Sequence, residues 1–164
     1  MNAYDFALQM EKDGEKFYSE LAENTQVEGI RTILTMLAGE EVKHYNTIAL
    51  LKKQAGYPPA LETDVLRNVR NIFFRMKDEK AEVRFDSSEL ESYRKARDIE
   101  EMSRKFYLDK AAETQQEDEK QIFFSLASEE EKHLRIMENI VEFVARPEPG
   151  YWLENAEWHH LEEY

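Results

Sequence analysis

The sequence contains the same four-residue motif, Glu-x-x-His, at two positions. One copy runs from Glu41 to His44 and the other from Glu130 to His133. Residues three apart on an α-helix project from the same face, one turn from each other, so each motif can present a carboxylate and an imidazole to one point. Oxygen and nitrogen donors at this spacing are typical of a metal site in a helical bundle.

Both motifs interrupt a hydrophobic stripe. Apolar residues recur at helical spacing on either side of them: Ile30, Leu34, Leu37, Ile48 and Leu51 around the first motif, and Phe123, Leu126, Met137, Ile140 and Val144 around the second. A buried carboxylate is costly unless it is paired or coordinates a metal ion. We therefore predict that cations lie beside the two motifs.

The two motifs belong to an internal repeat with an offset of 89 residues. Between 4–51 and 93–140, seventeen of forty-eight positions are identical. Ordinary residue usage would give about three identities by chance. The matching residues of the first copy are Tyr4, Ala7, Glu11, Lys16, Phe17, Tyr18, Ala22, Thr25, Gln26, Glu28, Ile33, Leu37, Ala38, Glu40, Glu41, Lys43 and His44. The chain is therefore two copies of one helical hairpin.

The repeat selects two further acids from the thirty-five in the chain. Glu11 precedes Glu41 by thirty residues, and Glu100 precedes Glu130 by the same interval. The midpoint of each interval falls at the predicted hairpin turn, so the two acids of a hairpin lie at matching height, roughly 20–24 Å from it at about 1.5 Å per residue. Four carboxylates and two imidazoles then converge at the centre of the bundle.

This oxygen-rich ligand set suits two iron ions, with manganese or zinc as alternatives. Four negative charges offset the four positive charges of two divalent ions. Our hypothesis is that Glu41 and Glu130 bridge the metals. Glu11 and Glu100 would bind one metal each as terminal ligands, and His44 and His133 would complete the two sites.

The elements that position these ligands are predicted to be helices throughout. We expect a hairpin over 4–55, a long crossover over 56–87 that contains a short helix near 63–78, and a second hairpin over 88–146. Capping boxes at Thr25, Ser88 and Thr114 mark three helix starts. The fold class is all-α, a four-helix bundle in one domain of residues 1–146. We interpret the crossover as a solvated strap rather than a docking surface, and residues 147–164 as a tail that contains Trp152, Trp158, His159 and His160.

Composition narrows the function classes. The net charge of −13 argues against nucleic acid and anionic membranes as partners, since both require a basic face. No apolar run reaches the length of about 20 residues that spans a bilayer, so we expect a cytoplasmic protein. The absence of cysteine excludes disulfides, thiolate ligands and Fe–S clusters from these 164 residues. We also expect a homodimer or a higher homo-oligomer.

The ligand pattern and its flanking residues resemble the rubrerythrin-type branch of the ferritin-like di-iron proteins. The matching text is the stretch 10–18, Met-Glu-Lys-Asp-Gly-Glu-Lys-Phe-Tyr, then Glu41-x-x-His44, Ile99-Glu100-Glu101-x-x-x-Phe106-Tyr107 and Glu130-x-x-His133. The resemblance covers residues 4–144. It implies a ferritin-like bundle with a di-iron centre that reacts with O2 or hydrogen peroxide, commonly in oxidative-stress defence.

Two features differ from the pattern of that family. Rubrerythrins usually carry a cysteine-containing rubredoxin domain, and this sequence has no cysteine, so electrons would come from a separate donor protein. Rubrerythrins also tend to carry an extra carboxylate three residues after the ligand at Glu100, where this sequence has Ser103.

Several other polar residues lie near the predicted ligands in the sequence. Tyr18 and Tyr107 lie two turns after Glu11 and Glu100, so their hydroxyls could bond coordinated carboxylates, or they could be core aromatics. The remaining neighbouring acids are interpreted as a solvated face or as groups outside the ligand shell: Glu15, Glu40, Glu101, Glu129 and Glu131. His159 and His160 are interpreted as surface histidines.

Two other functions stay open at this point. The first is iron handling as a ferroxidase or storage protein, which requires a shell-like assembly. The second is a non-catalytic helical module, stapled by a metal such as zinc, that binds another protein.

Overall fold

The computed structural model describes residues 2–53, 65–79 and 87–145. These residues form five α-helices: α1 (Ala3–Asn24), α2 (Glu28–Lys53), α3 (Val65–Glu79), α4 (Ser87–Glu113) and α5 (Glu117–Ala145). The hairpins predicted over 4–55 and 88–146 correspond to α1–α2 and α4–α5. The tail with His159 and His160 lies outside the described residues.

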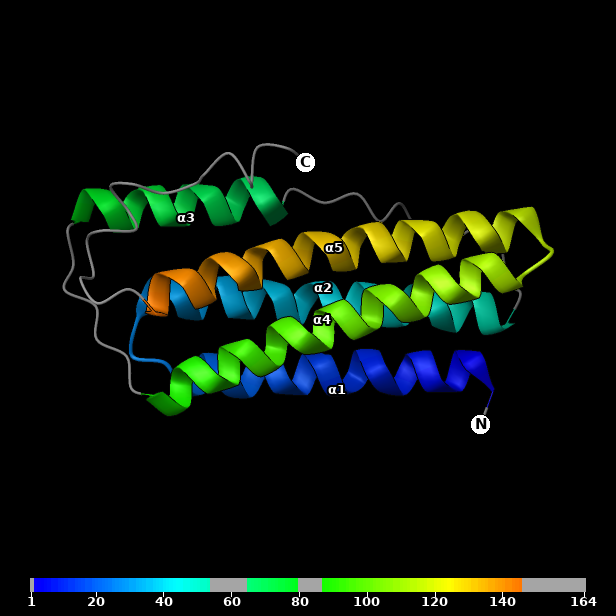
Figure 1. Ribbon diagram of the computed structural model, residues 1–164, viewed down its shortest axis with the longest axis horizontal. Helices are drawn as coiled ribbons and strands as arrows, with labels where there is room; N and C mark the ends of the chain where they lie inside the picture. Colours follow the sequence, from blue (N-terminus) through cyan, green and yellow to red (C-terminus); the bar gives the residue numbers. More distant parts are fainter. Residues whose placement is uncertain (1, 54–64, 80–86, 146–164) are drawn as a thin grey trace.

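The two hairpins are joined by a crossover along the bundle. Figure 1 shows that α2 and α4 run in the same direction, from left to right, so the chain returns over the length of the bundle between them. The helix α3 lies in this return and packs against α2 and α5. The protein is therefore an all-α, ferritin-like four-helix bundle with a long crossover, as the sequence predicts.

The turns inside the hairpins differ from the predicted capping boxes. The helices α2 and α5 begin at Glu28 and Glu117, three residues after the predicted caps. The Thr25 hydroxyl oxygen accepts a hydrogen bond from the Val27 N–H at 3.3 Å, and Thr114 makes the same contact with Gln116. These are short threonine turns, in which the side chain reaches a backbone donor two residues on. The third predicted cap, Ser88, lies inside α4, which begins one residue earlier.

The crossover helix contributes to the core. Val65, Val69, Ile72 and Phe73 are buried, and the Phe73 ring lies edge-on to Phe143 with the ring centroids 6.2 Å apart. A strap whose apolar residues recur every three or four positions buries one stripe and leaves the rest to solvent. The strap is thus part of the packed structure, with one solvated face.

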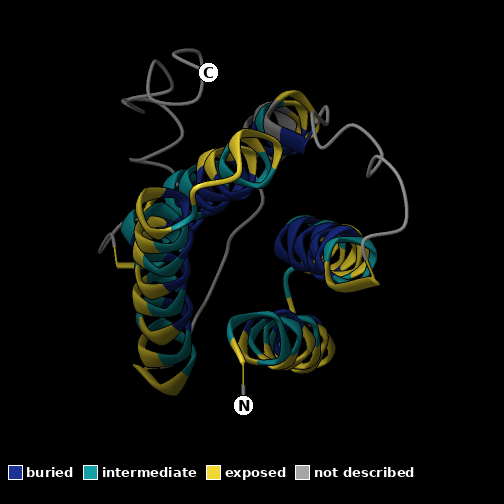
Figure 2. Ribbon diagram, turned by 90° about the vertical axis from the view of Figure 1, so that its right-hand side faces the viewer, coloured by how far each residue is buried: buried dark blue, intermediate teal, exposed yellow. Residues whose placement is uncertain are grey.

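The core consists of two apolar clusters with a polar layer between them. One cluster surrounds Leu34, Ile136 and the crossover helix, and the other surrounds Ile48, Tyr107 and Phe123. On each long helix the predicted ligands fall between residues of the two clusters. Figure 2 shows the buried faces of the helices turned toward the middle of the bundle and the exposed faces turned outward.

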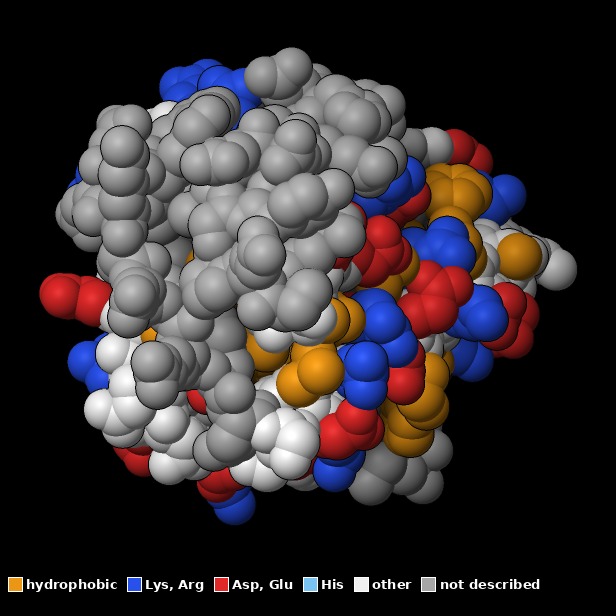
Figure 3. All heavy atoms as spheres, turned by 60° about the vertical axis from the view of Figure 1, so that its left-hand side comes forward, with side chains coloured by type: hydrophobic (Ala, Val, Ile, Leu, Met, Phe, Trp, Pro, Cys, Tyr) orange, Lys and Arg blue, Asp and Glu red, His pale blue; other side chains and the backbone are white. Residues whose placement is uncertain are grey.

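The solvated faces carry charges of both signs. Figure 3 shows acidic and basic side chains interspersed with hydrophobic ones at one end of the molecule. Many pair within one helix, such as Arg94 with Glu91 and Arg104 with Glu101. Among the described helices, none combines the length and apolar character needed to cross a membrane.

Candidate metal centre

All four long helices contribute side chains to the polar layer at mid-length. The helices α1 and α4 each provide one glutamate, and α2 and α5 each provide a glutamate and a histidine. Each of the six residues is at most 4 % exposed: Glu11, Glu41, His44, Glu100, Glu130 and His133. The structure therefore brings together every metal ligand that the sequence predicts.

The six side chains form two overlapping groups of four. Glu11, Glu41, His44 and Glu130 place one ligand-type atom each within 4.8 Å of one another. Glu41, Glu130 and His133 do the same with Glu100. The two groups share only Glu41 and Glu130, which is the arrangement that two bridging carboxylates require.

Each histidine faces carboxylates of both hairpins. His44 Nδ1 lies 2.9 Å from Glu130 Oε1 and 3.5 Å from Glu11 Oε2. His133 Nδ1 lies 3.2 Å from Glu41 Oε1 and 3.7 Å from Glu100 Oε1. The imidazole rings are nearly parallel, with an interplanar angle of 8° and centroids 5.3 Å apart. The two Nδ1 atoms are therefore directed into the centre.

The tyrosines also connect the two hairpins. The Tyr18 hydroxyl of α1 donates a hydrogen bond to Glu100 of α4, and the Tyr107 hydroxyl of α4 donates one to Glu11 of α1. Burial raises the pKa of both phenols well above the usual range, and the nearby carboxylates raise it further. Both tyrosines therefore keep their hydrogens and act as donors. Each one bonds the glutamate of the opposite hairpin.

Without metal, the centre reduces its charge by holding protons. Burial raises the pKa values of Glu41 and Glu130 well above the usual range, and Glu11 and Glu100 raise them further. Burial would also raise the pKa of Glu11, but the His44 imidazole and several hydrogen bonds together outweigh it and leave the pKa at about 2. Burial lowers the pKa of His44, whereas Glu11, Glu100 and other carboxylates give it a net increase.

The donor set fits a pair of divalent cations. One oxygen each of Glu11, Glu100 and Glu130 is buried without a hydrogen-bond partner in the described part of the chain. Such oxygens are costly in a protein interior unless a cation or donor meets them. An oxygen-rich set with one imidazole per group suits iron or manganese. The cluster is that of a metal-binding site.

Comparison with known families agrees with this geometry. A family model described as rubrerythrin matches residues 3–141, a range that contains all six side chains. The chain belongs to the rubrerythrin family. The searches of curated proteins and of solved structures found no match.

In this chain the position of Gly14 in the first hairpin corresponds to Ser103 in the second. A Cβ atom at Gly14 would lie 3.1 Å from Glu41 Oε2, so the glycine makes room for that carboxylate. Ser103 is buried, and its hydroxyl donates to the Ile99 carbonyl at 3.0 Å. The second hairpin thus has a small side chain bonded to its own helix where rubrerythrins tend to have an extra acid.

Two of the neighbouring acids are buried. From the sequence, both could lie either on a solvated face or close to the metals. Glu40 is 7 % exposed and Glu129 is 2 % exposed. The solvated-face interpretation is wrong for both. Each lies four residues before a histidine ligand, a spacing that places the two side chains on one helix face. That spacing was the signal in the sequence.

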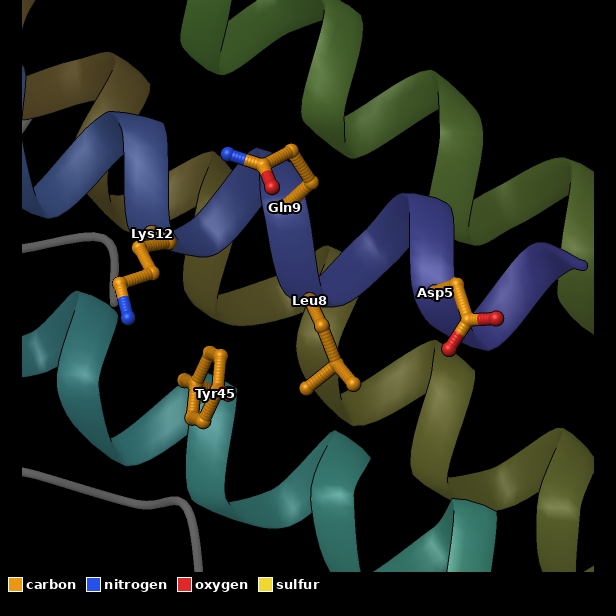
Figure 4. Close-up of a pocket in the computed structure, with 5 residues that line it drawn as sticks. All are labelled: Asp5, Leu8, Gln9, Lys12 and Tyr45. Atoms are coloured by element: carbon orange, nitrogen blue, oxygen red, sulfur yellow. The ribbon is translucent and has the colours of Figure 1, made fainter. Parts of the chain in front are cut away.

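A surface groove lies on the outer side of the first hairpin. It is lined by Asp5, Leu8, Gln9 and Lys12 of α1 and by Tyr45 of α2 (Figure 4). The Lys12 ammonium lies over the Tyr45 ring, 5.9 Å from its centroid. None of the six side chains of the centre lines this groove.

Proposed function

We propose that this protein is a di-iron oxidoreductase that reduces hydrogen peroxide or O2. The observation that supports it best is the pair of four-ligand groups that share Glu41 and Glu130 inside an apolar core. Two metals joined by shared carboxylates are suited to two-electron chemistry. When bound, two ferrous ions supply the two electrons that, together with two protons, reduce one hydrogen peroxide molecule to two waters.

The protein's contribution is to hold and isolate the centre. Glu11 and Glu100 would serve as terminal ligands, and the hydrogen bonds from Tyr107 and Tyr18 fix their carboxylates in place. Apolar clusters on both sides of the layer exclude bulk water and lower the local dielectric constant. These 164 residues contain no cysteine, so an Fe–S electron donor would lie outside them.

Rapid mixing tests this proposal. Protein loaded with two ferrous ions is mixed anaerobically with hydrogen peroxide, or aerobically with O2, while the visible absorbance of ferric iron is followed. We expect fast oxidation in the wild type and a large loss of rate in Glu41→Ala, which removes a carboxylate shared by both groups. Glu131→Ala, a neighbour of Glu130 outside the ligand groups, is the matched control. Equal rates in the wild type and Glu41→Ala would contradict the proposal.

A further inference from the structure

Glu40 and Glu129 are buried carboxylates that the ligand set does not use. Each lies one residue before a shared glutamate. Glu40 Oε1 lies 3.3 Å from Lys43 Nζ, and Glu129 Oε1 lies 2.9 Å from Lys132 Nζ. The other oxygen of each, Oε2, is buried and has no hydrogen-bond partner among the residues that the structure describes. Half of each carboxylate is therefore available to another group.

The histidine ligands have a matching unpaired atom. Their Nδ1 atoms face the metal centre, and each Nε2, on the far side of its ring, is buried without a partner within the described helices. Glu40, His44, Glu129 and His133 bring one ligand-type atom each to within 4.8 Å of one another. Two acceptors and two ring nitrogens are thus gathered between α2 and α5.

Two arrangements fit these four side chains. They could bind a third metal ion, or the imidazole N–H groups could donate hydrogen bonds to the two carboxylates. Charge balance disfavours the ion, because the four central carboxylates already offset two divalent cations. Glu40 and Glu129 are offset by Lys43 and Lys132 in the same way. The tautomer of the two histidines also disfavours a third ion. A neutral imidazole that gives its Nδ1 lone pair to a metal carries its hydrogen on Nε2, which then donates and does not coordinate.

We propose that Glu40 and Glu129 accept the Nε2–H hydrogens of His44 and His133 when the centre is loaded. They are positioning residues, which hold each ring in the orientation that directs Nδ1 at a metal. The last side-chain torsion of glutamate is broad, so each carboxylate can turn an oxygen toward a ring nitrogen. Lys43 and Lys132 anchor the opposite oxygens of these two carboxylates. This inference rests on the proposed di-metal centre.

The test compares Glu40→Gln, Glu129→Gln and the double variant with Glu131→Gln. Glutamine keeps the size of the side chain and removes its charge, and Glu131→Gln makes the same change next to a ligand but outside this group. Anaerobic competition titration with Co(II) measures affinity, and the visible bands of bound Co(II) report ligand geometry. Loss of such outer partners costs roughly 10- to 100-fold in metal affinity. We expect that loss and shifted bands in the double variant, and neither in Glu131→Gln.

Several outcomes would overturn the inference. One is a double variant that folds, by circular dichroism, and matches the wild type in both affinity and bands. Another is a wild type that binds three ions per chain while the double variant binds two, since that identifies a third cation site. If the double variant does not fold, the two single variants decide the question by the same readouts. A wild type that binds two ions but does not react with peroxide or O2 refutes the proposed function alone, because this test measures binding and geometry.

Discussion

The space around Glu41 depends on one glycine. A methyl group at Gly14 would lie 3.1 Å from Glu41 Oε2 and 3.3 Å from its Cδ, closer than ordinary contact. Glu41 has little freedom to move away, because His133 Nδ1 lies 3.2 Å from its other oxygen. At Gly39, also in a helix, an added Cβ meets no atom within 4 Å. Alanine at Gly39 therefore tests helix propensity alone, whereas alanine at Gly14 also tests the packing around the metal centre.

We expect Gly14→Ala and Gly39→Ala to differ. Alanine stabilises a helix interior by roughly 0.5–1 kcal/mol relative to glycine, and Gly39→Ala should show that gain with unchanged metal affinity. Gly14→Ala should lose metal affinity and show a smaller gain or a net loss of stability, because the methyl group displaces the shared carboxylate. Urea unfolding of the metal-free protein and metal titration measure the two effects. Equal metal affinity in the two variants would show that Glu41 has room to shift.

The sequence predicts which six side chains come together, because their positions follow from spacing along one helix and from the repeat. Glu41 and His44 are three residues apart, and Glu11 is placed by the symmetry of the repeat. Burial of Glu40 and Glu129 depends instead on how closely α2 approaches α5, which is a relation between helices. Spacing along one helix places Glu40 beside His44 but leaves open whether a second helix covers it.

At the scale of the elements, the repeat predicts the hairpins and the position of their turns. The sequence does not determine the residue at which the second helix of each hairpin begins. The motif Thr-Gln-x-Glu is compatible with a helix that starts directly after the threonine or two residues later. The structure takes the later start, where the threonine oxygen bonds the N–H of the second residue on. The crossover helix was predicted from its apolar period, but its contact with α5 was not.

Because the crossover helix packs on the bundle through Phe73, replacing this residue should strongly destabilise the fold. This side chain is fully buried and packs edge-on against Phe143 of α5. We expect Phe73→Ala to lower the free energy of unfolding by about 3–5 kcal/mol, the usual cost of removing a buried phenylalanine. Asn68→Ala, at an exposed position of the same helix, should stay within about 0.5 kcal/mol of the wild type. Thermal and urea unfolding provide the comparison. A small effect at Phe73 would mean that α3 separates easily from the bundle.

At the scale of the whole molecule, side-chain contacts in the centre connect the two hairpins. Tyr18 bonds Glu100, Tyr107 bonds Glu11, and each histidine faces a shared glutamate of the opposite hairpin. Helices within a hairpin are joined by extensive apolar contacts, whereas these polar contacts cross between the copies. The protonation and metal content of the centre therefore affect the stability of the complete fold.

Stability without metal should fall as pH rises above about 4.5, the ordinary pKa of a glutamate, and more steeply above about 6.5, where His44 also contributes. The folded-state pKa values of Glu41, Glu130 and His44 are raised, so the folded protein holds protons that the unfolded chain has lost at the same pH. Stability then decreases by about 1.4 kcal/mol per pH unit for each such proton, until pH passes the folded-state pKa. Glu11 and Glu100 have lowered pKa values, and their contribution is complete above their unfolded pKa near 4.5.

Bound metal should reverse this pH dependence of stability. Two divalent ions replace the protons on Glu41 and Glu130, so binding releases protons and strengthens as pH rises. An ion at 100 times its Kd stabilises the fold by about 2.7 kcal/mol, so the difference in Tm between loaded and metal-free protein should widen from pH 6 to pH 8. Glu41→Gln imitates the protonated acid. It should flatten the pH dependence of the metal-free Tm and remove most of the stabilisation by metal. A metal-free Tm that rises with pH over this range would show that the shared glutamates are ionised in the empty centre, and that the hairpins tolerate their repulsion.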